Sequence, residues 1–272
     1  MTRIADALAH ARALRVDRLD AQLLLEHVLQ RPRSWLLAHD EVSLTESQAS
    51  NVAALLQRRA QGEPLAYLTG EKEFHGLMLQ VTPDVLIPRP DTETLVDWAL
   101  ALLQGGPLEP RVLDLGTGSG AIALALKHRH PSATVTAIDT SDAALSVAEA
   151  NAQRLGLDIR FVLGSWWSGA KNQQFDLVVS NPPYIALGDK HLPALRHEPE
   201  LALTSGVDGL DALRAIVSDA PAHLASSGWL LLEHGHDQSQ HVRALLLAAG
   251  FANVQTREDL AGIGRCTGGQ WR

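Results

Sequence analysis

The chain is organised around the stretch Phe175-Asp176-Leu177-Val178-Val179-Ser180-Asn181-Pro182-Pro183-Tyr184. Its first half is a short apolar run rich in β-branched residues, which predicts a buried strand of a parallel sheet. The strand must stop at Asn181, because neither of the two prolines that follow has an N–H to give to a sheet ladder. Open α/β sheets bind ligands at the carboxyl edge of their strands. We therefore expect a rigid corner at a ligand-binding edge.

The chemistry of this corner follows from its residue types. Pro182 and Pro183 have a fixed φ and offer only carbonyl acceptors, and Tyr184 closes the corner with a planar ring. Such a site suits a flat group bearing an NH2, whose two N–H bonds would go to the Asn181 side-chain oxygen and the Pro182 carbonyl, with a ring stacked alongside. A proline-rich turn after a strand is also common, so the interpretation depends on the rest of the chain.

Composition describes an ordinary globular protein. The 272 residues are 46% hydrophobic and 20% charged, enough for one large core or two domains. The single cysteine, Cys266, fits a reducing compartment. No signal peptide and no run long enough for a membrane span are apparent, so we expect a soluble, cytoplasmic protein without a membrane partner. A net charge of −8 argues against nucleic acid and favours a protein or small-molecule substrate.

Residues 1–72 are predicted to form a helical domain. Apolar residues recur at helical spacing, and Thr45-Glu46-Ser47-Gln48 has the form of a capping box that opens a helix. No catalytic constellation is present here, and the sequence leaves open whether this domain is a structural bundle or a module that docks a partner. Residues 73–90 are predicted to be a linker, with a strand or hairpin over 74–81.

The segment that follows contains Leu86-Ile87-Pro88-Arg89-Pro90-Asp91-Thr92-Glu93. Two prolines stiffen the approach to a helix, and Asp91 is predicted to be its N-cap. Gly105-Gly106-Pro107 is predicted to end that helix. Arg89 and Glu93 either face a ligand or pair with each other on the surface, and the surface pair is our expectation.

Residues 91–272 are predicted to form one domain, and from Arg111 strand and helix patterns alternate, which predicts an α/β fold with a doubly wound, mostly parallel seven-stranded sheet. The predicted strands are 112–115, 134–138, 159–163, 175–180, 229–232, 253–257 and 264–271, and the later predicted helices are 119–130, 141–155, 209–224 and one ending near Gly250.

A glycine-rich loop follows the first of these strands. Gly116-Thr117-Gly118-Ser119-Gly120-Ala121 satisfies the G-x-G-x-x-G/A fingerprint, in which glycines let a ligand approach the backbone at a helix N-terminus. Asp139 ends the next strand, where its carboxylate would accept both hydroxyls of a ribose. These features predict a cofactor that carries a nucleoside, and both NAD and S-adenosylmethionine are compatible with them.

The corner at Asn181 decides between these cofactors. No motif for a hydride-transfer site follows it, whereas an amide-binding corner beside the cofactor fits methyl transfer to a planar nitrogen. Two carbonyl acceptors would orient the nitrogen and stabilise the positive charge that develops on it. Tyr184 would add a modest cation–π contribution. No metal and no covalent nucleophile are required, and the proton leaves to water after the transfer.

Three motifs together resemble one family closely. They are Asp-Leu-Gly-Thr-Gly-Ser-Gly at 114–120, Ser-Asn-Pro-Pro-Tyr-Ile at 180–185 and Leu-Ile-Pro-Arg-Pro-Asp-Thr-Glu at 86–93. The chain is similar over its whole length to the HemK/PrmC family of methyltransferases, which modify the glutamine of the Gly-Gly-Gln motif in peptide chain release factors. The resemblance implies a Rossmann-like class I S-adenosylmethionine-dependent methyltransferase domain behind a small N-terminal helical bundle that docks the release factor. We also expect a monomer that acts without direct contact to nucleic acid.

The resemblance also implies roles for individual residues. Gly116, Thr117, Gly118, Ser119, Gly120 and Asp139 would bind S-adenosylmethionine, and Asn181, Pro182, Pro183 and Tyr184 would hold the glutamine amide, with Asn181, Pro182 and Tyr184 catalytic and Asn181 also near the cofactor. The family's tryptophan beside the adenine corresponds by spacing to Trp166, with Trp167 as the second choice.

Several patterns have more than one interpretation. Asn-Pro-Pro-Tyr is shared with adenine-N6 methyltransferases acting on DNA or RNA, which are the alternative function, and a cofactor-binding scaffold is the non-enzymatic one. The terminal Gly268-Gly269-Gln270 imitates a Gly-Gly-Gln motif, but we interpret it as chance because it falls in a predicted strand. The pairs His128/His130 and His234/His236 lack a third ligand and are expected to be surface or edge residues rather than a zinc site.

Overall fold

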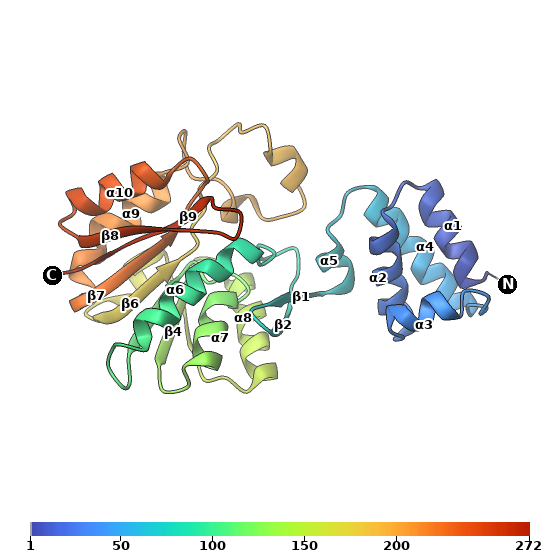
Figure 1. Cartoon of the computed structure of the whole chain (residues 1–272), viewed down its shortest axis with the longest axis horizontal. Coiled ribbons are helices and arrows are strands. Elements are labelled where there is room, and N and C mark those ends of the chain that lie inside the picture. Colours follow the sequence, from blue (N-terminus) through green and yellow to red (C-terminus); the bar gives the residue numbers. More distant parts are fainter. Residues whose placement is uncertain (1) are drawn as a thin grey trace. The chain divides into compact units, whose positions relative to one another are not determined.

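The structure is a computed structural model that describes residues 2–272, and it consists of two compact units, Met1–Glu71 and Lys72–Arg272 (Figure 1). Met1, with which the predicted helical domain begins, lies outside the described residues. Each unit has a hydrophobic core of its own. Within residues 2–272, no helix is long and apolar enough to span a bilayer.

The first unit is helical. Its elements are α1 (Ile4–Ala13), α2 (Arg18–Leu29), α3 (Arg33–Ala38), α4 (Glu46–Ala60) and α5 (Leu65–Thr69). Their apolar faces meet around Ile4, Leu24 and Leu56, each of which is at most 1% exposed. The predicted capping box is confirmed, since the Gln48 N–H donates to the Thr45 hydroxyl and the Thr45 N–H donates to the Gln48 side chain.

The second unit is a doubly wound α/β fold. Its strands are β1 (Glu71–Phe74), β2 (Leu77–Gln80), β3 (Arg111–Leu115), β4 (Thr134–Asp139), β5 (Arg160–Leu163), β6 (Phe175–Ser180), β7 (Leu224–Glu233), β8 (Ala252–Glu258) and β9 (Gly264–Gln270), and its α-helices are α6 (Glu93–Leu103), α7 (Ala121–Arg129), α8 (Asp142–Leu155), α9 (Asp211–Asp219) and α10 (Ser239–Ala248). Seven strands form one sheet in the order β5-β4-β3-β6-β7-β9-β8, in which only the pairs that involve β9 are antiparallel. The predicted fold class is confirmed.

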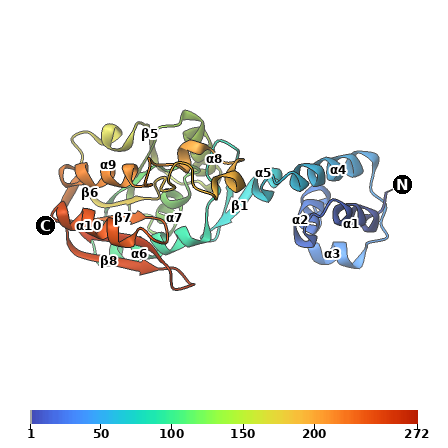
Figure 2. The same ribbon diagram turned by 90° about the horizontal axis from the view of Figure 1, so that it is seen from above.

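Helices cover both faces of this sheet (Figures 1 and 2). Successive residues of a strand point to opposite faces, so Val112 and Leu177 pack into one core with α6, α7 and α8. Their neighbours Leu113 and Val178 pack into the second core with α9 and α10. Because the central strands are buried on both faces, they read as continuous apolar runs rather than as alternating ones.

The strand or hairpin predicted over 74–81 is a hairpin that begins earlier, in which β1 pairs with β2. Leu77 and Leu79 are buried in the core that contains α6 and α7. The Asn151 side chain of α8 joins the hairpin to the sheet layer, because it accepts from the Gln80 N–H at 2.7 Å and donates to the Gln80 carbonyl at 3.0 Å. The hairpin is thus packed into the second unit.

Two expectations about residues 88–93 are wrong. Asp91 is not an N-cap: a short 3-10 helix, η1 (Pro90–Thr92), leads into α6, whose N-cap is Thr92, and Asp91 instead pairs with Arg265 at 3.1 Å. Arg89 does not pair with Glu93, because the Arg89 guanidinium bonds the buried Glu198. Glu93 accepts a hydrogen bond from the backbone N–H of His75. In both cases, a partner that is distant in the sequence determines which ion pair the side chain forms.

Two element boundaries also differ from expectation. The strand predicted over 229–232 extends over Leu224–Glu233, with an irregular register against β6. The helix predicted over 209–224 is α9, Asp211–Asp219, because Pro221 lies in the 3-10 turn η5 (Ala220–Ala222) that follows it.

The terminal Gly-Gly-Gln sequence lies in β9, between β7 and β8. Gly268 and Gly269 are buried. The Gln270 side-chain amide donates to the Ser227 carbonyl at 3.0 Å and accepts from the Asn253 amide at 2.9 Å. This glutamine is therefore part of a sheet, in keeping with the interpretation of the match as chance.

Gly268 is required by close packing. A Cβ at this position would lie 2.4 Å from the Leu231 side chain and 2.8 Å from the Leu230 backbone carbonyl oxygen. We expect Gly268→Ala to lower the free energy of unfolding by about 1–3 kcal/mol through overpacking. Gly105→Ala is the matched control, since its Cβ would meet nothing closer than 3.9 Å. Urea unfolding measures both, and equal losses would contradict the packing argument.

Candidate methyltransferase site

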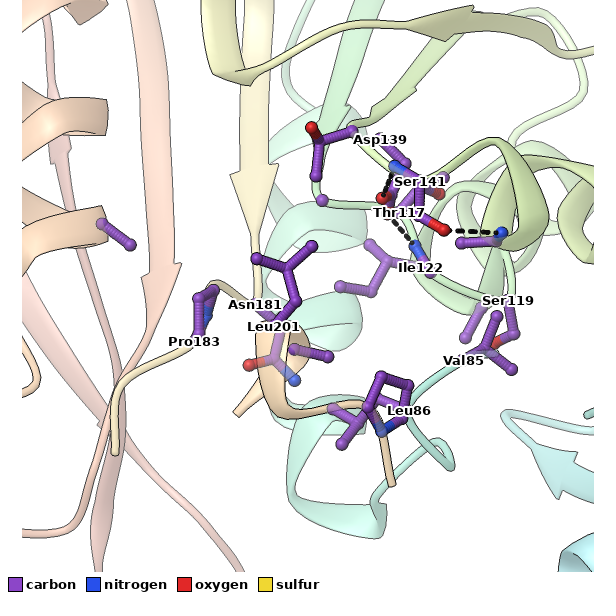
Figure 3. A pocket seen from close by; sticks show the side chains of 18 of the residues that line it. Val85, Leu86, Thr117, Ser119, Ile122, Asp139, Ser141, Asn181, Pro183 and Leu201 are labelled. Carbon is purple, nitrogen blue, oxygen red and sulfur yellow. Dashed lines mark hydrogen bonds between the residues drawn. The ribbon is translucent and has the colours of Figure 1, made fainter. Parts of the chain in front are cut away.

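A cavity of about 490 Å³ lies where β3, β4 and β6 end, at the carboxyl edge of the sheet. Eight of the residues that sequence analysis predicted for the site line it: Gly116, Thr117, Gly118, Ser119, Asp139, Trp166, Asn181 and Pro183. Figure 3 shows Asp139, Ser141 and Thr117 toward one end of this cavity, with Asn181 and Pro183 toward the other. The remaining predicted residues, Gly120, Pro182 and Tyr184, are not among its lining residues.

The glycine-rich loop forms a tight turn between β3 and α7. Gly116, Gly118 and Gly120 all have positive φ, at 72°, 56° and 83°. This conformation is inexpensive for glycine and strained for other residues. Gly120 also faces α8, because a Cβ there would lie 3.2 Å from the Ala148 side chain. Gly120 therefore lets the loop pack closely against α8 and does not itself line the cavity.

Asp114 holds this loop in place through hydrogen bonds. Its carboxylate Oδ2 accepts from the Thr117 hydroxyl at 2.7 Å and from the Ala123 N–H at 3.2 Å. Asp114 is completely buried, and its Oδ1 has no hydrogen-bond partner among residues 2–272. Burial raises the pKa of Asp114 to about 7, and these two hydrogen bonds oppose the shift.

Asp139 ends β4 and is half-buried at the cavity wall. Its Oδ2 accepts from the Gly118 N–H at 2.8 Å, and its Oδ1 accepts from the Ser141 N–H at 2.9 Å. These two bonds fix the plane of the carboxylate. Each carboxylate oxygen can accept more than one hydrogen bond, so both oxygens can also receive the hydroxyls of a ribose.

The two adjacent tryptophans face different surroundings. Trp166 lines the cavity, and its ring lies 3.6 Å from the position that a Cβ on Gly116 would occupy. Trp167 is 5% exposed, donates its indole N–H to the Ile216 carbonyl and stacks on His223 with ring centroids 4.8 Å apart. Trp166 can therefore contact a ligand in the cavity, whereas Trp167 belongs to the core.

Asn181 follows β6 directly and its side chain lies at the cavity. The Asn181 amide nitrogen Nδ2 donates to the Thr92 hydroxyl at 3.2 Å. Within residues 2–272, no hydrogen bond uses the Asn181 oxygen Oδ1 or the Pro182 carbonyl. Both oxygens are thus acceptors without a hydrogen-bond partner among the described residues.

Tyr184 lies beside the cavity rather than in its wall. Its hydroxyl donates to Glu233 Oε1 at 3.3 Å, and its backbone carbonyl accepts from the Gln238 side chain at 3.0 Å. Gly209 passes so close that a Cβ there would lie 2.2 Å from the same carbonyl oxygen. Burial, followed by the Glu233 charge, raises the pKa of Tyr184 above its usual value, so the phenol stays neutral.

Sequence reasoning missed the residues that hold the site together. Thr92 was recognised only as part of a motif, without a role of its own. Glu198 joins the loop after β6 to the segment before α6, because its carboxylate accepts from the Ile87 N–H at 3.2 Å and from the Arg89 guanidinium. Glu233 ends β7 at the same sheet edge. A charged residue directly after the apolar run Trp229–Leu232 is the one local signal that points to Glu233.

The expectation that His234 is a surface or edge residue is wrong. His234 is completely buried, and its two ring nitrogens bond the Thr267 hydroxyl and the Gly235 carbonyl, each at 2.8 Å. Burial lowers its pKa, so the ring favours the neutral form. It serves as a packed link between β7 and β9.

A doubly wound sheet with a glycine-rich loop beside a cavity at its carboxyl edge is the fold of Rossmann-like methyltransferases. In agreement, residues 96–197 match the family model described as "Methyltransferase small domain", and residues 1–70 match "PrmC N-terminal domain". A solved 16S rRNA N2 G1207 methyltransferase from T. Thermophilus, in complex with AdoMet and guanosine, is similar in fold, with a TM-score of 0.55, 21% identity and coverage of 74% of this chain and 50% of that chain.

Relatives identify the family more closely. The chain is 52% identical over 272 residues to the release factor glutamine methyltransferase of Bordetella pertussis, with 99% of each chain covered. It is 46% identical to the enzyme of the same name from Coxiella burnetii, with 92% of this chain and 91% of the relative covered. The protein belongs to the release factor glutamine methyltransferase family.

The raised pKa of Asp114 has a consequence for stability. Between its usual value of 3.8 and about 7, the folded protein keeps a proton that the unfolded chain has lost. The contribution of Asp114 to the free energy of unfolding therefore falls as pH rises through this window. Asp114→Asn cannot ionise, so the parent should lose stability relative to this variant between pH 4 and pH 7. Urea unfolding across this range measures the difference, and a constant difference would contradict the shift.

Proposed function

We propose that this protein transfers a methyl group from S-adenosylmethionine to the side-chain amide nitrogen, N5, of the glutamine in the Gly-Gly-Gln motif of peptide chain release factors. The family and the named relatives support the substrate. The arrangement of acceptors at the end of β6 supports the chemistry.

The residues at one end of the cavity fit the nucleoside part of the methyl donor. Asp139 would accept the ribose hydroxyls, the loop Gly116–Gly120 would let the cofactor approach the backbone, and Trp166 would lie against the adenine. When bound, this cofactor supplies a methyl group on a positively charged sulfur. These residues, Gly120 apart, line the cavity near the ends of β3, β4 and β5.

The residues at the other end fit a carboxamide substrate. An amide nitrogen is a poor nucleophile because its lone pair is delocalised, and placing its two N–H groups on Asn181 Oδ1 and the Pro182 carbonyl orients it toward the methyl group. The same acceptors stabilise the positive charge that develops as the N–C bond forms and the S–C bond breaks. The nitrogen then releases one proton to water.

One observation carries this proposal. Asn181 is held through its nitrogen by Thr92, and its oxygen is free at the cavity. A carboxamide in this orientation is an acceptor for incoming N–H groups, as a glutamine amide requires.

Asn181→Ala removes one of the two acceptors. We expect turnover with intact release factor to fall by about 100-fold or more, the size expected for loss of one preorganised group that stabilises developing charge. Transfer of labelled methyl, followed by mass spectrometry of the peptide that contains Gly-Gly-Gln, measures the rate and the position. Calorimetry with S-adenosylmethionine checks that the cofactor still binds.

Gln240→Ala, exposed on α10, is the control and should keep the turnover of the parent. Label from the parent protein in nucleic acid alone would contradict the proposal in favour of an adenine-N6 methyltransferase. Label in neither substrate would contradict the proposal in favour of a cofactor-binding scaffold that is not an enzyme.

We also propose that the helical unit, predicted as residues 1–72, helps to dock the release factor. It has its own core and a partly exposed apolar face on α3, where Leu37 is 50% exposed and the Trp35 ring is covered by Arg31, whose guanidinium carbon lies 5.5 Å from the ring centroid. The cavity and its corner lie entirely within the second unit. A docking role for this unit therefore separates recognition of the partner from the chemical step.

Leu37→Glu places a charge on this face. If α3 contacts the release factor, the KM for intact release factor should rise about tenfold, the effect of losing about 1.4 kcal/mol of binding. The KM for a short Gly-Gly-Gln peptide, which lacks the rest of the release factor, should stay unchanged. Steady-state methylation of both substrates decides the matter, and an unchanged KM for intact release factor would exclude this face.

A further inference from the structure

Glu198 is a buried carboxylate in the loop after β6, and its side chain is only 3% exposed. Its Oε2 accepts from the Ile87 N–H at 3.2 Å, and its Oε1 accepts from the Arg89 guanidinium. A carboxylate removed from water is costly unless it is both paired and hydrogen-bonded, and Glu198 meets both conditions. It therefore ties the loop after β6 to the segment before α6.

The segment before α6 leads from Glu198 to the amide-binding corner. The Thr92 N–H donates to the Arg89 carbonyl at 3.1 Å, and the Thr92 hydroxyl accepts from Asn181 Nδ2 at 3.2 Å. Prolines stand on both sides of Arg89 and restrict the backbone φ there. The segment is thus stiff, and the place where Glu198 holds Arg89 determines where Thr92 meets Asn181.

The loop after β6 leads from Glu198 to the other end of the corner. A short 3-10 helix, η4 (Glu200–Ala202), follows Glu198. Beyond it, the Leu203 carbonyl accepts from the Ile185 N–H at 2.9 Å, and the Ser205 N–H donates to the Ile185 carbonyl at 2.9 Å. Ile185 comes directly after Asn-Pro-Pro-Tyr, so this loop holds the corner at its far end.

These contacts form a closed ring around the corner. The ring passes in order through Asn181, Thr92, Arg89, Glu198, Leu203 and Ile185. Side chains supply two of its links, the bond between Asn181 and Thr92 and the pair between Arg89 and Glu198, while the backbone supplies the others. Loss of the Glu198 pair would therefore open the ring at a point outside the corner itself.

Both arms of the ring border the cavity. The segment before α6 contributes Leu86, Pro88 and Thr92 to the lining, and the loop after β6 contributes Pro199, Leu201, Ala202, Thr204 and Ser205. Figure 3 shows Leu86 and Leu201 toward the same end of the cavity as Asn181, away from Asp139. The ring thus belongs to the substrate end of the cavity, whereas the nucleoside residues take no part in its contacts.

We propose that Glu198 is a positioning residue that closes this ring and thereby keeps Asn181 Oδ1 and the Pro182 carbonyl aimed at the substrate amide. Glu198 is not one of the residues that line the cavity, so it acts through Thr92 and Ile185 rather than by contact with the substrate. This inference deepens the proposed function and depends on it for the identity of the substrate.

The reaction is sensitive to such positioning. A hydrogen bond from an amide nitrogen is best at about 2.9 Å and weakens as distance and angle depart from the optimum. A misplacement of about 1 Å caused by a change far from the chemistry can lower a rate about 100-fold. An open ring would leave Thr92 and Ile185 less firmly held, and both acceptors of the corner would lose their fixed positions.

The first test is kinetic. Glu198→Gln keeps the size of the side chain and removes the charge that pairs with Arg89. At saturating S-adenosylmethionine, we expect kcat with intact release factor to fall at least about tenfold and up to about 100-fold. The calorimetric Kd for S-adenosylmethionine should change less than about threefold, because the nucleoside residues lie outside the ring.

Three comparisons separate positioning from a general loss of stability. Glu200→Gln makes the same chemical change at an exposed position two residues away and should keep the kcat of the parent. Gly268→Ala, which is expected to destabilise β9, should also keep it, because Gly268 is not part of the ring. Arg89→Lys retains a positive charge for Glu198 and should lose less kcat than Arg89→Gln does.

The second test needs no activity. The side-chain NH2 signal of Asn181, observed by ¹⁵N NMR in the free protein, reports the hydrogen bond to Thr92. Thr92→Val removes the acceptor and should shift this signal, and Glu198→Gln should shift it in the same direction. Thr92→Ser and Glu200→Gln should leave it in place. In a double-mutant cycle, Glu198→Gln should lower kcat less in the Thr92→Val background than in the parent.

The outcomes distinguish this inference from the proposed function. If the parent methylates release factor while Glu198→Gln loses less than about tenfold in kcat, or loses only affinity for the cofactor, the inference alone is overturned. An Asn181 signal unchanged by Glu198→Gln would overturn it as well. Arg89→Gln, at a side chain that is 36% exposed, supplies the same two measurements if Glu198→Gln fails to fold. A parent that labels only nucleic acid would overturn the proposed function, while the NMR signal would still test the ring.

Discussion

The hydrogen bond from Asn181 Nδ2 to the Thr92 hydroxyl is the interaction on which the rest of the site depends. It joins the segment before α6 to the end of β6, 89 residues apart in sequence. Because this bond engages the nitrogen, the side-chain oxygen is left as an acceptor at the cavity. The Pro182 carbonyl beside it is fixed by the proline pair, whose restricted φ removes the flexibility that a loop would otherwise have.

The sheet order explains why these groups meet. β3, β4 and β6 are parallel neighbours, so the glycine-rich loop, Asp139 and Asn181 all emerge at one edge. β7 is parallel to β6 and brings Glu233 to the same edge, while antiparallel β9 returns Arg265 to it from the opposite direction. The cavity and the buried carboxylate of Glu233 thus lie at one edge of the same sheet.

The sequence was sufficient for the fold class and the order of strands and helices, because these depend on local periodicity and on glycine and proline. It also gave eight residues of the cavity wall, of which Trp166 was assigned through the family resemblance alone. It was not sufficient for the contacts of Arg89, Asp91 and Thr92. Their partners are Glu198, Arg265 and Asn181, each more than 80 residues away, and no local pattern encodes such pairings. Glu233 and His234 were missed for the same reason, since burial at a strand end is a property of the assembled sheet.

The central claim is that Asn181 Oδ1 and the Pro182 carbonyl receive the two N–H groups of a glutamine amide. A crystal structure with S-adenosylhomocysteine and a Gly-Gly-Gln peptide tests it most directly. Our account predicts that the peptide amide nitrogen lies about 2.9 Å from each of these two oxygens, with the nitrogen directed at the sulfur of the cofactor product. A peptide amide bound elsewhere, or an Asn181 side chain whose NH2 faces the substrate, would contradict it.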